Sequence, residues 1–258
     1  MKIAVAYKWA ANPEHAEVRP DGTIDWSRAK GAVSEYDPVA FELARRLADA
    51  TGGQVVGVSV GAAATDTPLA RKAALARGLD SLVLVADDRL AGADGTRLAA
   101  AIAGAVRAIG GVDVVLAGES SVDVGDGQVA MTVAGQLGWP ALNAVRAVQA
   151  DGAGLSVERE LPGIVQTVRV EGPVVLAATA GAAVPRVPGM KDILGAAKKP
   201  VEVLALDGLD LPEAGAALLP LGASRPDRGN RRSVMIDAAD VAAAAAELTA
   251  ALRQSGLL

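Results

Sequence analysis

A buried strand, a polar loop and a helix follow one another in residues 112–140, and this order restricts the fold strongly. Residues 112–117 are mostly Val and Leu without strict alternation, which is typical of a strand covered on both faces. Apolar residues then recur at helical spacing over residues 129–137, and the sequence Gly-Trp-Pro ends the helix. A strand that passes through a loop into a helix is the repeating unit of a parallel α/β sheet.

The loop between this strand and this helix, residues 118–127, has the composition of a phosphate-binding turn. Unpaired backbone N–H groups and the positive end of the helix dipole meet at a helix start. The dipole contributes about 0.3 to 1 kcal/mol per charge, whereas a carboxylate about 4 Å from a phosphate costs on the order of 4 kcal/mol. Asp123 and Asp126 are therefore expected to cap the loop or helix, or to accept hydrogen bonds from ribose hydroxyls. The alternative is that the loop is only a connection.

Three similar strand–helix units precede this one. Four units in a row predict a mostly parallel sheet with right-handed crossovers and helices on both faces, a Rossmann-like α/β fold. Asp37 and Pro38 are expected as the N-cap and first residue of a helix that stops at Gly52. The other expected elements are strands at residues 3–7, 54–60 and 80–86 and helices at residues 67–76 and 94–109.

After Pro140 the pattern changes to short extended runs. We expect hairpin strands at residues 143–149, 155–160, 165–170 and 174–179, which complete the sheet on one side. The long stretch at residues 12–30, with a turn at Asp21-Gly22, is expected to be a functional or partner-covering excursion.

Composition and charge exclude several classes of function. A net charge of −5 argues against a nucleic-acid partner. With no cysteine and His15 as the one histidine, the chain has no disulfide, thiolate nucleophile, His-based triad or multi-His metal site, and we expect neither catalytic residues nor a metal. No uninterrupted apolar run reaches the roughly 20 residues of a membrane span, so a cytoplasmic protein without membrane insertion is expected. Neither a G-x-G-x-x-G motif nor a Walker lysine is present.

The loop sequence GESSVDVGDGQV, followed by a helix that ends in GWP, resembles the nucleotide-binding loop of the electron transfer flavoprotein beta subunit, GxxxxDxDxxQ-T/V. Asp123 and Gln128 match the motif, whereas Val124 and Gly125 depart from it and leave the identity of the nucleotide open. The first strand ends in Ala-Tyr-Lys where the family has an AVK-like triplet. The segment SEYDPVAFELA stands where the family has NPFDEIALEEA-like residues.

The resemblance implies the adenine nucleotide alpha hydrolase-like variant of the Rossmann fold and an enclosed adenine nucleotide. The implied nucleotide-binding residues are Ala6, Ser34, Glu35, Tyr36, Asp37, Val60, Gly118, Glu119, Ser120, Ser121, Val122, Asp123, Val124, Gly125, Asp126, Gly127, Gln128 and Val129.

A second segment, at residues 184–200, has the sequence VPRVPGMKDILGAAKKP and contains three prolines. Its apolar residues Met190, Ile193 and Leu194 are expected either to face solvent and dock a partner, or to be part of an ordinary core. It resembles the family's recognition loop, PRYPSLPGIMKAKKKP, which docks dehydrogenases through a leucine anchor, and Met190 falls at the anchor position. The implied docking residues are Pro185, Arg186, Pro188, Met190, Lys191, Ile193, Lys198 and Lys199.

The expected organisation is a nucleotide-binding domain at residues 1–184, the recognition loop at residues 185–200, and a C-terminal arm and helix at residues 201–258. Residues 207–232, rich in Pro, Gly, Leu and charged residues, are expected to form an arm without a core of its own. Asp237 is expected to precede a last helix at residues 238–253, which lies against the alpha subunit.

The resemblance implies an electron-carrier subunit without bond-making catalysis. An alpha subunit would share its FAD with this chain, which would bind AMP or a second FAD. Electrons would pass from acyl-CoA-type dehydrogenases, as in fatty acid oxidation, to a quinone oxidoreductase or a ferredoxin. Two alternatives stay open: an electron-bifurcating form with a second FAD, and a nucleotide-binding sensor or ATP-dependent hydrolase on the same fold.

Overall fold

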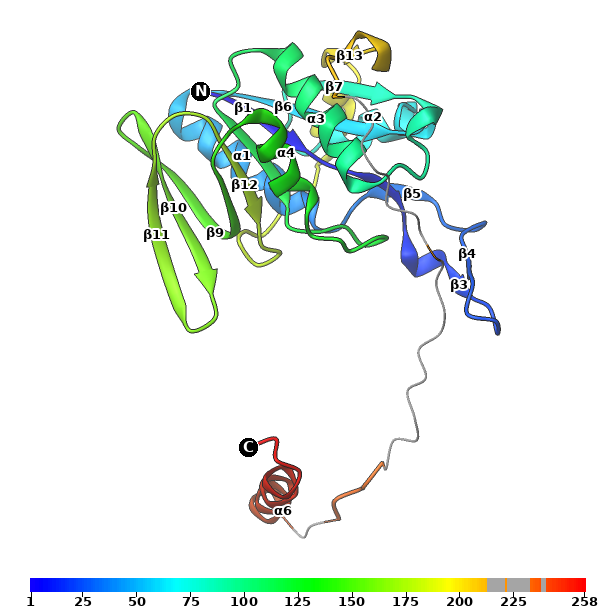
Figure 1. The fold of residues 1–258 in the computed structure, drawn as a ribbon, viewed down its shortest axis with the longest axis vertical. Helices are drawn as coiled ribbons and strands as arrows, with labels where there is room; N and C mark the ends of the chain where they lie inside the picture. The colour runs from blue at the N-terminus through cyan, green and yellow to red at the C-terminus, as the bar shows by residue number, and fades with distance from the viewer. Residues whose placement is uncertain (213–220, 222–232, 238–239) are drawn as a thin grey trace. The chain divides into compact units, whose positions relative to one another are not determined.

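The structure is a computed structural model that describes residues 1–212, 221, 233–237 and 240–258. It divides into two units: residues 1–19 with 24–221, and residues 20–23 with 222–258. The described part of the first unit contains a nine-stranded sheet in the order β11-β10-β9-β12-β8-β1-β6-β7-β13 (Figure 1).

The centre of the sheet is parallel, as predicted. Its strands are β1 (Lys2–Ala6), β6 (Gln54–Gly61), β7 (Ser81–Ala86), β8 (Val114–Gly118) and β12 (Val174–Ala178). The short β13 (Val201–Val203) extends the parallel order beyond β7. Each central strand is almost completely buried, because helices cover both faces of the sheet.

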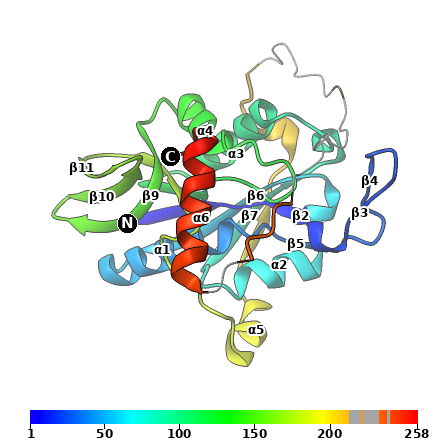
Figure 2. The same ribbon diagram turned by 90° about the horizontal axis from the view of Figure 1, so that it is seen from below.

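Two pairs of helices cover opposite faces of this sheet (Figure 2). On one face, α1 (Asp37–Thr51) and α2 (Pro68–Leu75) pack on strand residues such as Ile3. On the other face, α3 (Gly95–Ile109) and α4 (Val129–Leu137) pack on the alternate residues, such as Ala4. Aromatic residues make up only 2% of the chain, so both layers are built from Ala, Val and Leu.

The helix ends follow the predicted capping signals with one exception. Thr67 accepts a hydrogen bond from the N–H of Ala70 at the start of α2, at 3.1 Å. Gly138 ends α4 in the left-handed conformation. The prediction that Asp37 is the N-cap of α1 is wrong: Tyr36 precedes the helix and provides no side-chain cap, while Asp37 lies in the first turn. The Asp37 carboxylate instead accepts a hydrogen bond from the backbone N–H of Lys8.

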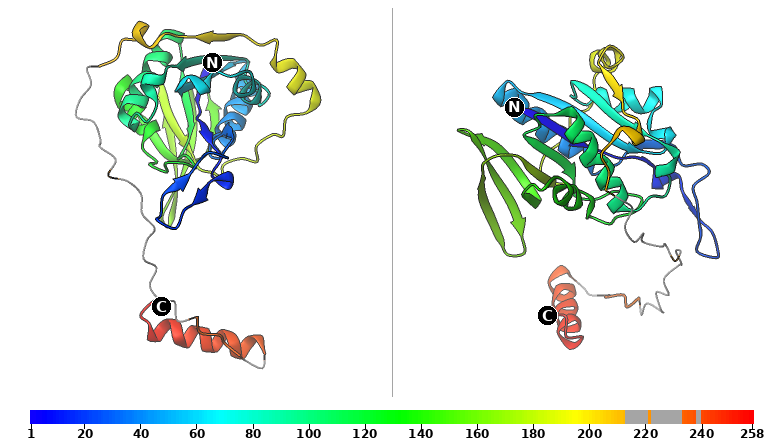
Figure 3. Two further views of the ribbon diagram at one scale, coloured as in Figure 1. Left: turned by 90° about the vertical axis from the view of Figure 1, so that its right-hand side faces the viewer. Right: turned by 45° about the horizontal axis from the view of Figure 1, so that its top comes forward.

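The antiparallel part of the sheet consists of β9 (Ala141–Asp151), β10 (Gly154–Leu161) and β11 (Ile164–Val170). The hairpin of β10 and β11, green in Figure 3, extends beyond the helical layers. The expectation of a fourth hairpin strand at residues 174–179 is wrong, because β12 lies between β8 and β9 and is parallel to both. All five of its residues are buried, which is what a central strand requires.

The excursion after β1 forms two short pairs of strands. Strand β2 (Trp9–Ala11) pairs with β5 (Gly31–Val33), and β3 (Glu17–Val18) pairs with β4 (Ile24–Asp25). Single 3-10 turns are η1 (Pro13–His15), η2 (Ala63–Thr65), η3 (Asp88–Leu90) and η4 (Leu206–Gly208).

Two further helices follow the sheet. The short α5 (Met190–Ala196) lies within the expected recognition loop. In the second unit, α6 (Val241–Gln254) begins after Asp240, which accepts a hydrogen bond from the N–H of Ala243, so the expected start after Asp237 is a few residues early. Residues 213–220 and 222–232 of the expected arm, and residues 238–239 of the expected helix, lie outside the described residues. Among the helices that the structure describes, none has the length and apolar character to cross a membrane.

Candidate functional site

The strand order reverses direction between β1 and β8, and this reversal creates a gap at one edge of the sheet. The chain leaves β1 through α1 toward β6 on one side, and later crosses through α3 to place β8 on the other side of β1. Because α1 and α3 cover opposite faces, the carboxyl ends of β1 and β8 are not closed by the same helix. Ligands of open α/β sheets bind at such a switch point.

The buried carboxylate of Asp37 joins the segments that meet at this gap. It is 4% exposed and accepts hydrogen bonds from the backbone N–H of Lys8, at 2.8 Å, and from that of Gly118. A Cβ atom on Gly118 would lie 2.6 Å from the carbonyl oxygen of Tyr36 and 2.9 Å from Oδ1 of Asp37. Only glycine therefore allows β8 to approach the start of α1 this closely.

The same burial changes the pKa of Asp37. Loss of solvation raises the pKa of Asp37 from 3.8 to about 7, against the opposing effects of the two backbone hydrogen bonds and the positive charge of Lys8. The group thus titrates near neutral pH.

Ser34 and Lys8 fix the loop that follows β8. The N–H of Ser34 donates to the carbonyl of Lys8 at 2.9 Å, and its buried hydroxyl accepts from the N–H of Val122 at 3.4 Å. The ammonium group of Lys8 lies 2.7 and 2.9 Å from the two carboxylate oxygens of Asp123. Partial burial opposes ionisation of Asp123, but the hydrogen bond and charge of Lys8 outweigh it and lower the pKa of this carboxyl.

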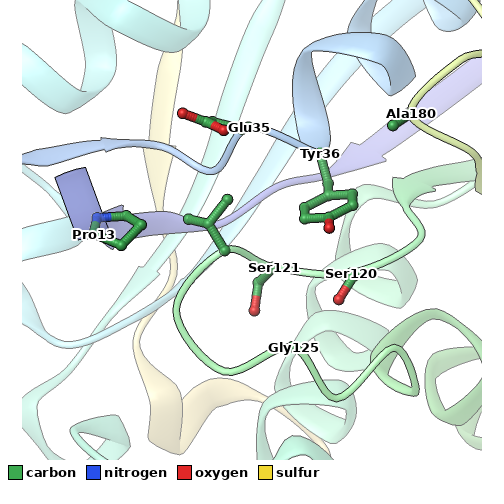
Figure 4. Close-up of a pocket in the computed structure, with 8 residues that line it drawn as sticks. Pro13, Glu35, Tyr36, Ser120, Ser121, Gly125 and Ala180 are labelled. Atoms are coloured by element: carbon green, nitrogen blue, oxygen red, sulfur yellow. The ribbon is translucent and has the colours of Figure 1, made fainter. Parts of the chain in front are cut away.

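A pocket of about 640 Å³ opens beside this network (Figure 4). The Tyr36 ring points from the start of α1 toward the loop that carries Ser120 and Ser121. Gly125 and Gly127 have φ angles of 75° and 64°, which the loop needs in order to turn into α4. The residues that line this pocket are Pro13, Glu35, Tyr36, Ser120, Ser121, Val122, Gly125 and Ala180.

A second pocket of about 330 Å³ shares Tyr36 and Ser120 with the first. It borders a bulge in β9, where the pairing with β12 shifts and Ala144 has a φ of 53°. An L-residue in this left-handed region costs on the order of 1 to 2 kcal/mol. The lining residues are Tyr36, Glu119, Ser120, Gly127, Asn143, Ala144 and Ala177.

The predicted nucleotide-binding residues divide into four groups. Eight line a pocket, while Ser34, Asp37 and Gly118 form the support beneath it. Ala6 and Val60 lie at strand ends within or against the core, and Val129 packs against the core from α4. Asp123 is held by Lys8, and Val124, Asp126 and Gln128 are exposed.

Sequence reasoning missed Lys8 as a partner of the loop, as well as the lining residues on β9 and after β12. The position of Lys8 directly after the first strand was the available signal. The β9 and β12 contributions depended on strand order, for which no local signal exists.

The expected docking segment is anchored at both ends. The guanidinium of Arg186 donates to the Glu42 carboxylate at 2.7 Å, and Arg46 binds the other oxygen of that carboxylate at 2.7 Å. Burial opposes ionisation of Glu42, but the two arginines outweigh it and lower its pKa. Lys199 donates to the carbonyls of Leu75 and Leu79 at 2.9 and 2.6 Å. The ammonium group of Lys199 thus binds backbone carbonyls of this chain.

Between these anchors, apolar residues divide into a buried and an exposed set. The expectation that Ile193 faces solvent is wrong, because it packs against the core beside the buried Ala196. Met190 is 75% exposed and Leu194 is 66% exposed, and Val187 just before them is 90% exposed. Lys191 and Lys198 are exposed, and the prolines at 185 and 188 are half-buried.

Within the described ranges, no group of three or more His, Cys, Asp or Glu side chains is arranged to hold a metal ion.

The strand order and the switch-point pocket define a doubly wound α/β protein of the adenine nucleotide alpha hydrolase-like class. A sequence model of the electron transfer flavoprotein domain matches residues 21–209, which is most of the chain. The chain belongs to the electron transfer flavoprotein family. It is therefore an electron-carrier subunit of a family that binds flavin and forms heterodimers, and that includes both alpha and beta subunits.

Proposed function

We propose that the chain is the beta subunit of a heterodimeric electron transfer flavoprotein and binds an adenine nucleotide at the switch-point pocket. The observation that carries the proposal is an open pocket beside the loop after β8, to which Lys8 and Ser34 are bound while Asp37 binds Lys8 and the end of β8. A recognition-type segment after β12 in the same chain supports the beta assignment.

The pocket fits an adenylate in size and chemistry. Its volume of about 640 Å³ falls within the roughly 300 to 1,000 Å³ of small-molecule and cofactor sites. Tyr36 offers an aromatic face for adenine, and Ser120 and Ser121 offer hydroxyl groups for ribose or phosphate. The loop glycines let backbone N–H groups approach the ligand closely.

The pocket beside it favours one further candidate function. Because the two pockets share Tyr36 and Ser120, a ligand longer than AMP has room to continue toward Asn143 and Ala144. A second FAD at this place would make the protein an electron-bifurcating form.

In the proposed heterodimer, the FAD shared with the alpha subunit accepts and releases the electrons. Residues of this chain bind and orient the nucleotide and cover the cofactor, and none of them makes or breaks a substrate bond. The α6 helix, which has no buried residue and exposes Val241 and Leu248, is proposed to pack on the alpha subunit.

The segment at residues 184–200 is proposed to dock the electron donor, an acyl-CoA-type dehydrogenase. Val187, Met190 and Leu194 present apolar side chains on a backbone that Arg186 and Lys199 hold in place. An anchored backbone loses little conformational entropy when a partner binds. The acceptor after the flavin is a quinone oxidoreductase or a ferredoxin.

Copurification of this chain with an electron transfer flavoprotein alpha subunit, followed by extraction of the cofactors, tests the proposal. We expect a heterodimer with FAD and one further adenine nucleotide. One flavin with AMP supports the simple carrier, and two flavins support the bifurcating form. Failure to form a heterodimer, absence of any nucleotide from this chain, or nucleoside triphosphate hydrolysis by the isolated chain would contradict it.

A further inference from the structure

The proposed nucleotide site is acidic, although its ligand would carry a phosphate. Glu35 and Glu119 line the pockets, and Asp123 lies in the loop. Uncompensated carboxylates at this distance repel a phosphate. A site of this composition therefore needs a cation that is held close to the loop.

We propose that Lys8 is the specificity-determining residue that lets this site bind a nucleotide rather than a nucleoside. This inference rests on the proposed nucleotide site. Lys8 would act by pairing with Asp123, which cancels the nearest loop charge, and by directing its remaining donor to the phosphate. It is a positioning and charge-compensating residue for the ligand.

The geometry of Lys8 suits this role because both its backbone and its side chain are fixed. Its N–H donates to Asp37 at 2.8 Å, and its carbonyl accepts from Ser34 at 2.9 Å. An ammonium group has three N–H donors, and the two oxygens of Asp123 take two of them at 2.7 and 2.9 Å. One donor is left for a ligand.

Electrostatics within the described residues also single out Lys8. It is the cation that acts on both Asp37 and Asp123, whereas these two carboxylates repel each other. The side chain is one-third exposed and that of Asp123 is 19% exposed, so water and salt screen this pair less than a surface pair. Loss of Lys8 would leave Asp123 as an unpaired negative charge in the loop.

The test compares AMP with adenosine, because the two ligands differ only in the phosphate. Binding of each is measured by calorimetry to the full-length protein, with its alpha subunit, after removal of endogenous nucleotide. For Lys8→Met we expect AMP affinity to fall about 30-fold and adenosine affinity to fall less than about 3-fold. Lys8→Arg should retain most of the AMP affinity because it keeps the charge.

Asp123 provides the matched variants. Lys8→Met combined with Asp123→Asn should recover AMP affinity to within about 5-fold of wild type, since the unpaired carboxylate is gone. Asp123→Asn alone leaves Lys8 free and should tighten AMP by several-fold more than it changes the affinity for adenosine. This variant keeps the test valid if Lys8→Met does not fold.

Equal losses of AMP and adenosine in Lys8→Met would show a merely structural role and overturn the inference. Unchanged AMP affinity in Asp123→Asn would also count against it. These outcomes differ from failure of the proposed function, in which the wild-type protein binds neither ligand.

Discussion

Two segments follow neighbouring parallel strands at the same edge of the sheet and are held in opposite ways. The loop after β8, residues 119–128, is bound by Ser34 and Lys8, and Lys8 is itself bound by Asp37. This loop presents hydroxyl groups and backbone groups to a pocket. The segment after β12, residues 184–200, is held at its ends by long charged side chains and presents apolar groups to solvent.

The difference teaches what each kind of site requires from its support. A small polar ligand needs donors at fixed positions, so the first segment depends on a close backbone approach at Gly118. A protein partner gains affinity from buried apolar area, so the second segment needs only a stable platform for exposed side chains. Substitutions should therefore act through the backbone in the first segment and through side-chain area in the second.

The largest expected effect comes from a methyl group at Gly118. Gly118→Ala places a Cβ 2.6 Å from the carbonyl oxygen of Tyr36 and should lower the free energy of unfolding by on the order of 3 kcal/mol. Nucleotide binding should be lost with it. Denaturant unfolding and calorimetry measure both effects.

Gly135→Ala is the matched control, because nothing lies within 4 Å of its added Cβ in α4. It should stabilise the protein by about 0.5 to 1 kcal/mol through helix propensity. If the two glycine variants behaved alike, the close approach at Gly118 would not support the loop as argued.

The second effect is a dependence of stability on pH. Because burial raises the pKa of Asp37 to about 7 from 3.8, its contribution to stability is complete below the unfolded value and is lost as the pH rises to about 7. The free energy of unfolding of wild type relative to Asp37→Asn should fall by on the order of 3 kcal/mol from about pH 4 to about pH 7.5. A difference that stays constant over this range would contradict the buried, neutral carboxyl.

The third effect separates docking from packing within the second segment. Met190→Ala removes an exposed side chain and should lower electron transfer at limiting dehydrogenase concentration about 10-fold, without loss of flavin or stability. Ile193→Ala, in the same helix, should instead lower the free energy of unfolding by about 1 to 2 kcal/mol because Ile193 packs on the core. Unchanged electron transfer in Met190→Ala would remove the docking role.

The smallest effect concerns backbone strain beside the proposed nucleotide site, because the docking segment has no such strain. Ala144 has a φ of 53° beside the second pocket, whereas no residue from 184 to 200 has a positive φ. Ala144→Gly should stabilise the protein by up to about 1 kcal/mol. Ala147→Gly, elsewhere in the same strand, should destabilise it by about 0.5 to 1 kcal/mol. A loss of stability in both variants would mean that Ala144 is not strained.

Local sequence signals predicted most of the elements and the position of the loop. Thr67-Pro68 and Gly138 mark helix ends because capping depends on residues that are neighbours in the chain. The unbroken Val and Leu run before the loop predicts a buried parallel strand for the same reason. The sequence also indicated which loop residues could face a ligand, and six of them line a pocket.

Only the tertiary structure decided which distant segments meet. Contacts between residues far apart in the chain determine three features. Strand β12 lies between β8 and β9, Ile193 packs on the core, and Asp37 accepts a hydrogen bond from Lys8 instead of capping α1. The pairing of Lys8 with Asp123 spans 115 positions. Sequence patterns report which face of an element is apolar, whereas the partner of a charged or strand-edge group is set by strand order and packing.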